Sequence, residues 1–287
     1  RSIWNGLFSS KHGQWDITSC GTGATRLSPA CNINKKFYQT GDPTVSYGCG
    51  LSDLDEGLST LFFSEVLNRN HYSTERLLGI IEVPNKTGIH VRANKNLRRP
   101  GHVFLALKQG KKEELRPLLD YYIQRQVNNC EWENVPVKPH WRYRYALEKI
   151  AASFAQVAAR YEDDYIFCWF DWDGDNILMD GGIIDYGSVR QFGLFHREYR
   201  YDDITRYSTN IVEQKSKAKY IVQTFCQAIE FLLKHQKQPI EQFSRHWGVK
   251  LFEKEFKRQR LKNICYKIGF TKEQTAYLVE KRPELIV

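Results

Sequence analysis

Acidic residues are concentrated between residues 171 and 187, where their oxygen atoms could hold a metal ion. The candidate ligands are Asp171, Asp173, Asp175 and Asp185, with Asn176 directly after the third, and a fifth acid, Asp180, lies in the turn between them. Residues 176–186 are β-rich around the turn Asp180-Gly181-Gly182, so we expect a hairpin that returns Asp185 close to Asn176. So dense a group of carboxylates repels itself unless a cation is present, and Mg²⁺ prefers hard oxygen ligands together with substrate phosphates. The segment therefore predicts a magnesium and phosphate site.

The spacing in this segment is also that of a kinase catalytic loop. Asp171 and Asn176 have the spacing Asp-x-x-x-x-Asn, and Asp185-Tyr186-Gly187 stands where kinases carry a metal-binding Asp-Phe-Gly triplet. The alternative is an acidic surface turn between two strands. We favour the site, because apolar pairs at 177–178 and 183–184 indicate that both sides are buried and hold the acids in place.

The elements that must position this segment change in character along the chain. Up to about residue 99 the chain is rich in loops and strands, with strands expected at 15–19, 77–83 and 88–93. Beyond Gly101 the periodicity is helical almost throughout. Helices are expected at 103–108, 112–126, 144–161, 210–235, 241–247, 249–268 and 271–281, with a loop at 127–141. The pattern predicts an α+β protein.

A further helix is expected at 54–68, within the β-rich part. Its apolar residues Leu54, Leu58, Leu61 and Phe62 recur at helical spacing and form a stripe. Glu65 falls inside this stripe, whereas Glu56 lies about 180° away from Glu65 around the helix. Only one of the two carboxylates can therefore point into a site.

The composition is that of an ordinary globular chain. Apolar residues make up 41% and charged residues 26% of the 287 residues, which excludes disordered, collagenous and disulfide-scaffold proteins. No apolar run approaches the roughly 18 residues of a membrane helix, so we expect no membrane span. The seven cysteines are scattered without a Cys-x-x-Cys pair, which is typical of reduced thiols in a cytoplasmic protein.

The net charge of +9 suits a nucleotide or a phosphorylated substrate as well as nucleic acid. The basic run at 250–262 is interrupted by Glu253 and Glu255 at helix-pairing spacing, so we interpret it as a solvated helix face and expect no nucleic-acid partner. His102, His196 and His246 have no neighbouring cluster in the sequence that would make them ligands.

Several short motifs together resemble those of the selenoprotein O family, in the family's order, over about residues 15–228. They are Gly21-Thr22-Gly23-Ala24-Thr25-Arg26-Leu27-Ser28-Pro29, Gly41-Asp42, Ser64-Glu65, Thr74-Glu75-Arg76, Asp175-Asn176 and Ile184-Asp185-Tyr186-Gly187. The resemblance implies a two-lobed, protein-kinase-like fold. A small β-rich N-lobe would span residues 1–99, and a larger helical C-lobe with the catalytic loop and the metal-binding hairpin would span 100–287.

The same resemblance implies an activity. Family members bind ATP in a flipped orientation and transfer AMP to hydroxyl side chains of proteins, so ATP and Mg²⁺, or Mn²⁺, are the expected cofactors. Protein substrates with Ser, Thr or Tyr hydroxyls are the expected partners.

The resemblance also assigns roles to individual residues. Asp175 matches the family's catalytic Asp, and Asn176 and Asp185 match its two metal ligands. Arg92 and Arg99 match the arginines that grip the phosphates, work that suits guanidinium groups. In addition, Asp42 resembles the acid of an Asp-Gly turn near the nucleotide, although Pro43 replaces the glycine.

Departures from the family pattern leave two alternatives. Cys20 stands where the family has Lys, so the cation that would pair with Glu65 or Glu56 and hold a phosphate is absent, as in a catalytically impaired, nucleotide-binding pseudokinase. Asp171 stands at the position of the kinase base, where the family has no acid, which suits phosphotransfer instead. The upstream glycine-rich loop is not recognisable in residues 1–14, and the chain opens on Arg1, so we expect a processed form or an N-lobe that continues upstream.

Overall fold

The computed structural model describes residues 2–11, 13–23, 35–36, 50–168, 174–186, 189–191 and 211–286. The chain forms two compact units. The first comprises Arg1–Leu97, Gln124–Glu133 and Ile183–Gly187, and the second comprises Arg98–Ile123, Asn134–Gly182 and Ser188–Val287. A four-stranded antiparallel sheet belongs to the first unit and most of the described helices to the second, so the predicted α+β class is confirmed. None of the helices in the described ranges is long and apolar enough to cross a membrane.

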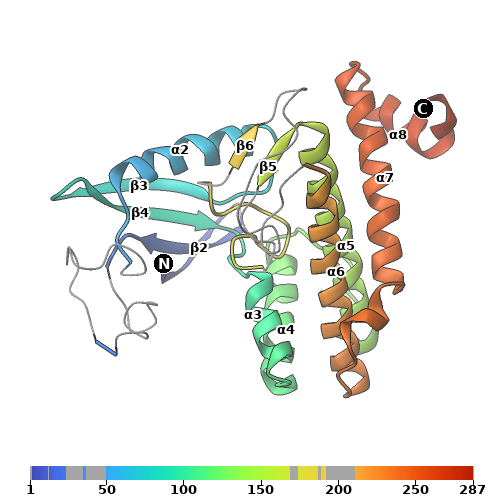
Figure 1. Ribbon diagram of the computed structural model, residues 1–287, viewed down its shortest axis with the longest axis horizontal. Helices are drawn as coiled ribbons and strands as arrows, with labels where there is room; N and C mark the ends of the chain where they lie inside the picture. The colour runs from blue at the N-terminus through green and yellow to red at the C-terminus, as the bar shows by residue number, and fades with distance from the viewer. Residues whose placement is uncertain are drawn as a thin grey trace. The chain divides into compact units, whose positions relative to one another are not determined.

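The sheet of the first unit has the order β1-β2-β4-β3 (Figure 1). Its strands are β1 (Ser2–Ser10), β2 (Gly13–Cys20), β3 (Arg76–Val83) and β4 (Thr87–Asn94). The predictions for β2, β3 and β4 are confirmed within a few residues, whereas β1 was not predicted. In the central pair, Thr18 lies opposite Arg92 and Cys20 opposite His90, so alternate residues give this part of the sheet one strongly polar face.

Helix α2 (Leu54–Arg69) packs on β3 and β4 and confirms the helix predicted at 54–68 (Figure 1). The side chains that it buries are Gly57, Thr60, Ser64 and Leu67, mostly small ones. A Cβ atom at Gly57 would overlap Nε2 of His90, so the missing side chain lets the helix approach the sheet. The expected apolar stripe instead points outward, with Leu58 51% and Phe62 65% exposed.

A buried network of charges and amides joins the sheet to helix α4 (Lys112–Asn128). Arg125 lies 3.5 Å from the Asp16 carboxylate and donates to the carbonyl of Lys95 at 2.6 Å. Asp16 also accepts hydrogen bonds from the indole of Trp4 and the backbone N–H of Leu97. Because both charged side chains are almost fully buried, each is the main compensation for the other.

The second unit is a helical assembly in which α5, α6 and α7 lie side by side (Figure 1). Its helices are α3 (Pro100–Lys108), the start of α4, α5 (Pro139–Asp163), α6 (Ile211–Lys234), α7 (Trp247–Lys267) and α8 (Lys272–Lys281). The 3₁₀ turns η1 (Ile240–Phe243) and η2 (Pro283–Leu285) and the strand pair β5 (Ile166–Cys168) and β6 (Val189–Gln191) complete it. Phe154, Phe225 and Phe252 are fully buried in this assembly and anchor its core.

Two helix boundaries in this unit differ from the sequence predictions. The helix expected at 241–247 is only the short turn η1, because α7 begins at Trp247, where the His246 side chain accepts a hydrogen bond from the Gly248 N–H. The loop expected at 127–141 is shorter, because α4 continues to Asn128 and Pro139 begins α5 at a position that proline favours.

The hairpin expected at 176–186 is wrong in form. Residues 174–186 are all described, and they contain turns and single bridges rather than two paired strands. The Leu178 N–H donates to the Gly182 carbonyl at 2.8 Å, which closes a tight turn, and Ile183 pairs with Thr74 instead. The apolar residues Ile177, Leu178, Ile183 and Ile184 are nevertheless buried, as expected.

The Asp16–Arg125 pair gives a direct test of the first unit's stability. Asp16→Ala leaves a buried guanidinium without its carboxylate, so the free energy of unfolding should fall by about 3–5 kcal/mol. The matched control is Glu131→Ala, which removes the half-exposed Lys95–Glu131 pair and should cost less than about 1 kcal/mol. Urea denaturation of both variants measures the difference, and equal costs would contradict this account of the network.

Candidate functional site

The loop that carries Asp175 is held against the beginning of α3. Nη1 of Arg99 donates to the carbonyl oxygen of Asp175 at 2.7 Å, and the Gly101 N–H donates to the carbonyl of Gly174 at 3.0 Å. Both ends of these bonds belong to the second unit. The structure thereby brings together two residues to which the resemblance assigns roles in one reaction.

Two glycines make this close approach possible. A Cβ atom at Gly101 would overlap the Asp175 carboxylate, and one at Gly174 would lie 2.7 Å from Cβ of Pro100. Gly174 also has a φ of +98°, which L side chains rarely adopt. The Asp175 side chain therefore lies over the first turn of α3, where the helix dipole favours a negative charge.

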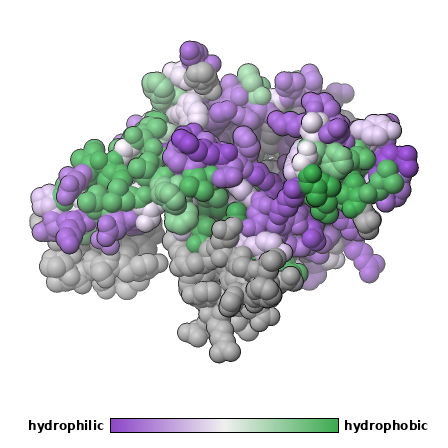
Figure 2. Space-filling model, turned by 90° about the horizontal axis from the view of Figure 1, so that it is seen from above, coloured by the Kyte–Doolittle hydropathy of each residue, from purple (hydrophilic) through white to green (hydrophobic). Residues whose placement is uncertain are grey.

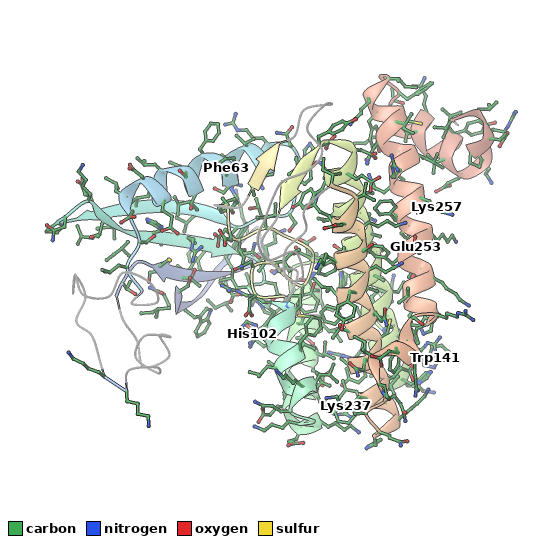
Figure 3. The ribbon with its side chains drawn as sticks, viewed as in Figure 1. Phe63, His102, Trp141, Lys237, Glu253 and Lys257 are labelled. Carbon is green, nitrogen blue, oxygen red and sulfur yellow. The ribbon has the colours of Figure 1, made fainter. Side chains whose placement is uncertain are left out.

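His102 is a member of this group that the sequence analysis missed. Its Nδ1 accepts a hydrogen bond from the Arg99 N–H at 3.2 Å, and it lies near the start of α3 (Figure 3). Burial and the positive charges of Arg99 and Arg98 lower the pKa of His102, against the opposite effect of Asp175. The imidazole is therefore held neutral, with its proton on Nε2.

A second polar group lies under the sheet of the first unit, around Arg92. Nη1 of Arg92 donates to the Glu75 carboxylate at 2.7 Å and Nη2 donates to the Ser2 hydroxyl, whereas the buried Nε has no hydrogen-bond partner among the described residues. Burial acts to lower the pKa of Arg92, but Glu75 and then Cys20 outweigh it and raise the pKa. Arg92 is thus a permanent cation whose charge is already matched by Glu75.

Tyr186 closes the same group from the segment that carries Asp185. Its hydroxyl lies 2.5 Å from Oγ1 of Thr74, and its ring stacks on Phe63 of α2, with ring centroids 6.4 Å apart. Burial and the charge of Glu75 raise the pKa of Tyr186 well above its usual range, so the phenol stays protonated. These contacts fix the backbone next to Asp185, whose side chain is half-buried.

The two α2 carboxylates have different partners. Glu65 accepts from Arg76 at 2.5 and 3.0 Å, and Glu56 accepts from the Ser52 hydroxyl at 2.5 Å. That hydroxyl also lies 3.4 Å from Nδ1 of buried His90, the residue opposite half-buried Cys20 in the sheet. Among the described residues, neither carboxylate has a lysine partner: Glu65 is paired with Arg76, and Glu56 is bonded to the Ser52 hydroxyl.

The other predicted site residues divide between the units. Arg92 and Asp185 belong to the first unit, whereas Arg99, Asp175 and Asn176 belong to the second. Asp42 and Asp171 lie outside the described residues. Within the described ranges, which also omit Asp173, no three His, Cys, Asp or Glu side chains form a group that could hold a metal ion.

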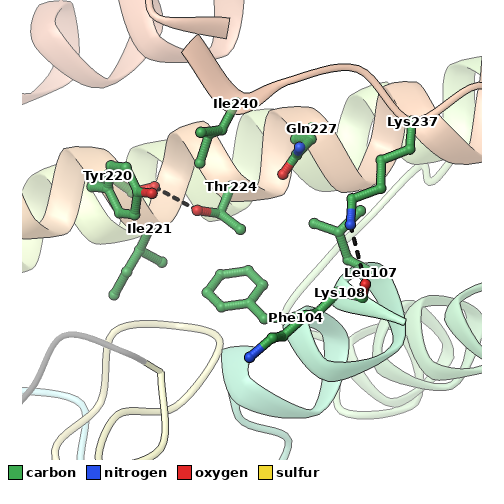
Figure 4. Close-up of a pocket in the computed structure, with 9 residues that line it drawn as sticks. All are labelled: Phe104, Leu107, Lys108, Tyr220, Ile221, Thr224, Gln227, Lys237 and Ile240. Atoms are coloured by element: carbon green, nitrogen blue, oxygen red, sulfur yellow. Dashed lines mark hydrogen bonds between the residues drawn. The ribbon is translucent and has the colours of Figure 1, made fainter. Parts of the chain in front are cut away.

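A pocket of about 390 Å³ lies elsewhere in the second unit, between α3 and α6 (Figure 4). Its lining is mostly apolar, with Phe104 and Ile221 beside the longer polar chains of Lys108 and Lys237. Lys237 donates to the carbonyl of Lys108 at 3.2 Å, at the end of α3. None of the predicted site residues lines this pocket.

The residues that the sequence analysis missed are chiefly those whose partners are distant in the chain. Glu75, directly before β3, pairs with Arg92 of β4, and Asp175, whose charge acts on His102, lies beyond helices α4 and α5 in the chain. The sequence of β4 indicates where such partners lie, because His90, Arg92 and Asn94 alternate with apolar residues and give the strand one polar face. That alternation predicts polar partners beneath the sheet, although it does not identify them.

Comparison of the sequence with models of protein families and with curated proteins finds no match.

His90 gives a pH-dependent prediction for this site. Burial lowers its pKa below 6.5, against the opposing effects of Glu56 and the Asp53 carbonyl, so the unfolded chain binds a proton at a higher pH than the folded chain does. The contribution of neutral His90 to the free energy of unfolding is therefore fully present above pH 6.5. It is lost as the pH falls toward the pKa of His90 in the folded chain. His90→Gln should flatten the fall in unfolding free energy between pH 8 and pH 5, measured with urea at each pH. A variant with the slope of the unmodified chain would contradict this assignment.

Proposed function

We propose that this chain is a protein adenylyltransferase, which transfers AMP from ATP to hydroxyl side chains of proteins. The observation that carries the proposal is the hydrogen bond from Nη1 of Arg99 to the carbonyl of Asp175, at 2.7 Å within one compact unit. These residues are far apart in the chain, and the resemblance to the selenoprotein O family assigns one to phosphate binding and the other to catalysis. Their contact supports a shared role.

The chemistry requires a base and a cation at the reacting phosphate. The hydroxyl oxygen of the target protein bonds to the α-phosphorus, the bond to the bridging oxygen breaks, and pyrophosphate leaves. Asp175, which is exposed and so within reach of a protein substrate, takes the proton, and Arg99 adds positive charge nearby. Bound ATP with Mg²⁺ would supply the electrophilic phosphorus, and the resemblance assigns Asn176 and Asp185 to that ion, which accepts amide and carboxylate oxygens as ligands.

We place this activity in a kinase-like fold, with residues 1–99 as the small lobe and 100–287 as the large one. Support comes from the sheet order β1-β2-β4-β3 with α2 packed on it in the first unit, and from the helical second unit with the Asp175 loop. Free thiols at Cys226 and Cys265, both buried, support a reducing, cytoplasmic location.

Labelled ATP tests the proposal. The chain and a cell lysate are incubated with Mg²⁺ and ATP labelled on the α or the γ phosphate, and we expect only α label on protein. Asp175→Asn should lower this transfer about 100-fold or more, because it removes the base. The matched control is Asp164→Asn at the end of α5, which should leave transfer unchanged.

Each other outcome of this experiment has a defined meaning. Label from the γ phosphate alone would contradict adenylylation and indicate phosphotransfer, with Asp171 as its base. Full α transfer by a folded Asp175→Asn variant would contradict the role of Asp175. If neither label reaches protein, the second candidate is favoured.

That second candidate is a nucleotide-binding pseudokinase. It is favoured by one observation: Cys20 occupies the position at which the resemblance expects Lys, and Glu65 of α2 is bound by Arg76 instead. A cation at position 20 would then be the missing part of the catalytic machinery.

Restoring that cation tests the pseudokinase candidate. Under this candidate, Cys20→Lys should raise ATP turnover by about tenfold or more, because a phosphate-binding ammonium is regained. Cys130→Lys, at an exposed free cysteine, is the matched control and should produce no gain. If folded Cys20→Lys also gives no gain, another residue holds the phosphate and the candidate is contradicted.

A further inference from the structure

The outward face of α2 is apolar, although the helix is packed on its sheet. Leu58, Phe62 and Val66 are 51%, 65% and 39% exposed, and at 100° per residue they lie within about 40° of one line along the helix. The buried residues, Gly57 to Leu67 at helical spacing, occupy the opposite side. Figure 2 shows apolar surface on the side of the first unit where α2 lies. Exposed apolar stripes of this kind commonly mark interaction sites.

The order of residues along this stripe is symmetric about Phe62. Leu58 and Val66 lie equally far before and after Phe62, and so do Asp55 and Arg69 at the two ends. Asp55 stands in the first turn of the helix and Arg69 in the last, and both are exposed. When the helix is reversed about Phe62, apolar residues therefore fall on apolar positions, and Asp55 and Arg69 change places.

We propose that two copies of this chain associate through α2, antiparallel to each other, about a two-fold axis at Phe62. Leu58 of each copy then packs on Val66 of the other, and Asp55 of each faces Arg69 of the other. The opposed helix dipoles also favour this direction. In a two-fold interface every contact occurs twice, which is how one surface can complement itself.

The charges select both the direction and the partner. A parallel pairing would place Asp55 against Asp55 and Arg69 against Arg69, so like charges would meet at both ends. A stripe that binds a helix of a different protein does not need to be symmetric about its own centre. The self-complementary order is what points to a second copy.

The expected dimer is weak and salt-dependent. Helix α2 has 16 residues, so it is only about 24 Å long and buries less area than the roughly 1,200–2,000 Å² of a standard interface. The terminal ion pairs are exposed and are screened by salt. Association should therefore rise with protein concentration and fall as the ionic strength increases.

Sedimentation of the full chain tests the interface at its axis. We expect a concentration-dependent dimer, and Phe62→Glu should weaken it at least about tenfold, because two carboxylates then meet at the axis. Val212→Glu on α6 is the matched control, since Val212 is also 65% exposed on a helix, and it should leave the dimer intact. Circular dichroism of the variants in dilute solution shows whether each remains folded.

A charge exchange tests the antiparallel direction. Asp55→Arg and Arg69→Asp should each weaken the dimer, and the double variant Asp55→Arg with Arg69→Asp should restore it. A monomer at the highest concentration studied, or a dimer that survives Phe62→Glu, would overturn the proposal. Failure of the double variant to recover dimerisation would overturn the antiparallel pairing. These readouts are independent of any adenylylation activity.

Discussion

The buried ion pair between Arg92 and Glu75 is the interaction on which the first unit depends. Both side chains are withdrawn from water, so removing either would leave a charge whose desolvation costs about 3–5 kcal/mol. The pair lies where β1, β4 and the segment before β3 meet, because Arg92 of β4 also donates a hydrogen bond to Ser2 of β1. Thr74, the residue before Glu75, forms a hydrogen bond with Tyr186. The chain just after Asp185 is therefore positioned by the same group that stabilises the sheet.

This pair also changes what the candidate site can use. In kinases a strand lysine bonds a helix carboxylate, and that bond connects the helix to the sheet. Here the cation Arg92 of β4 is bound by Glu75, and α2 contacts the sheet in two places: Gly57 lies against His90, and Glu65 pairs with Arg76 at the start of β3. Small side chains at the first contact free the larger apolar ones to face outward.

Elements held by local hydrogen bonds were predictable from the sequence, whereas contacts between residues far apart in the chain were not. Helical periodicity identified α2, α5, α6 and α7, because their hydrogen bonds are local. Periodicity did not show which face of α2 is buried, since a glycine and small polar residues make the contact with the sheet. The hairpin at 176–186 failed because Ile183 pairs with Thr74, more than a hundred residues earlier, rather than with its neighbours. Of the candidate site residues, Arg99 and Asp175 lie in contact, through the Arg99 side chain and the Asp175 carbonyl, whereas their roles remain predictions.

Helix α2 connects the proposed interface to the metal-ligand candidate through adjacent residues. Phe62 faces outward, whereas Phe63 stacks on Tyr186, which directly follows Asp185 in the chain. A second copy seated on Phe62 would therefore lie one residue from the ring that packs on Tyr186. Association shifts the position of Asp185 only if the two states of α2 bind the second copy with different affinity. In this structure, Phe63 and Tyr186 join the outward face of α2 to the segment that carries Asp185.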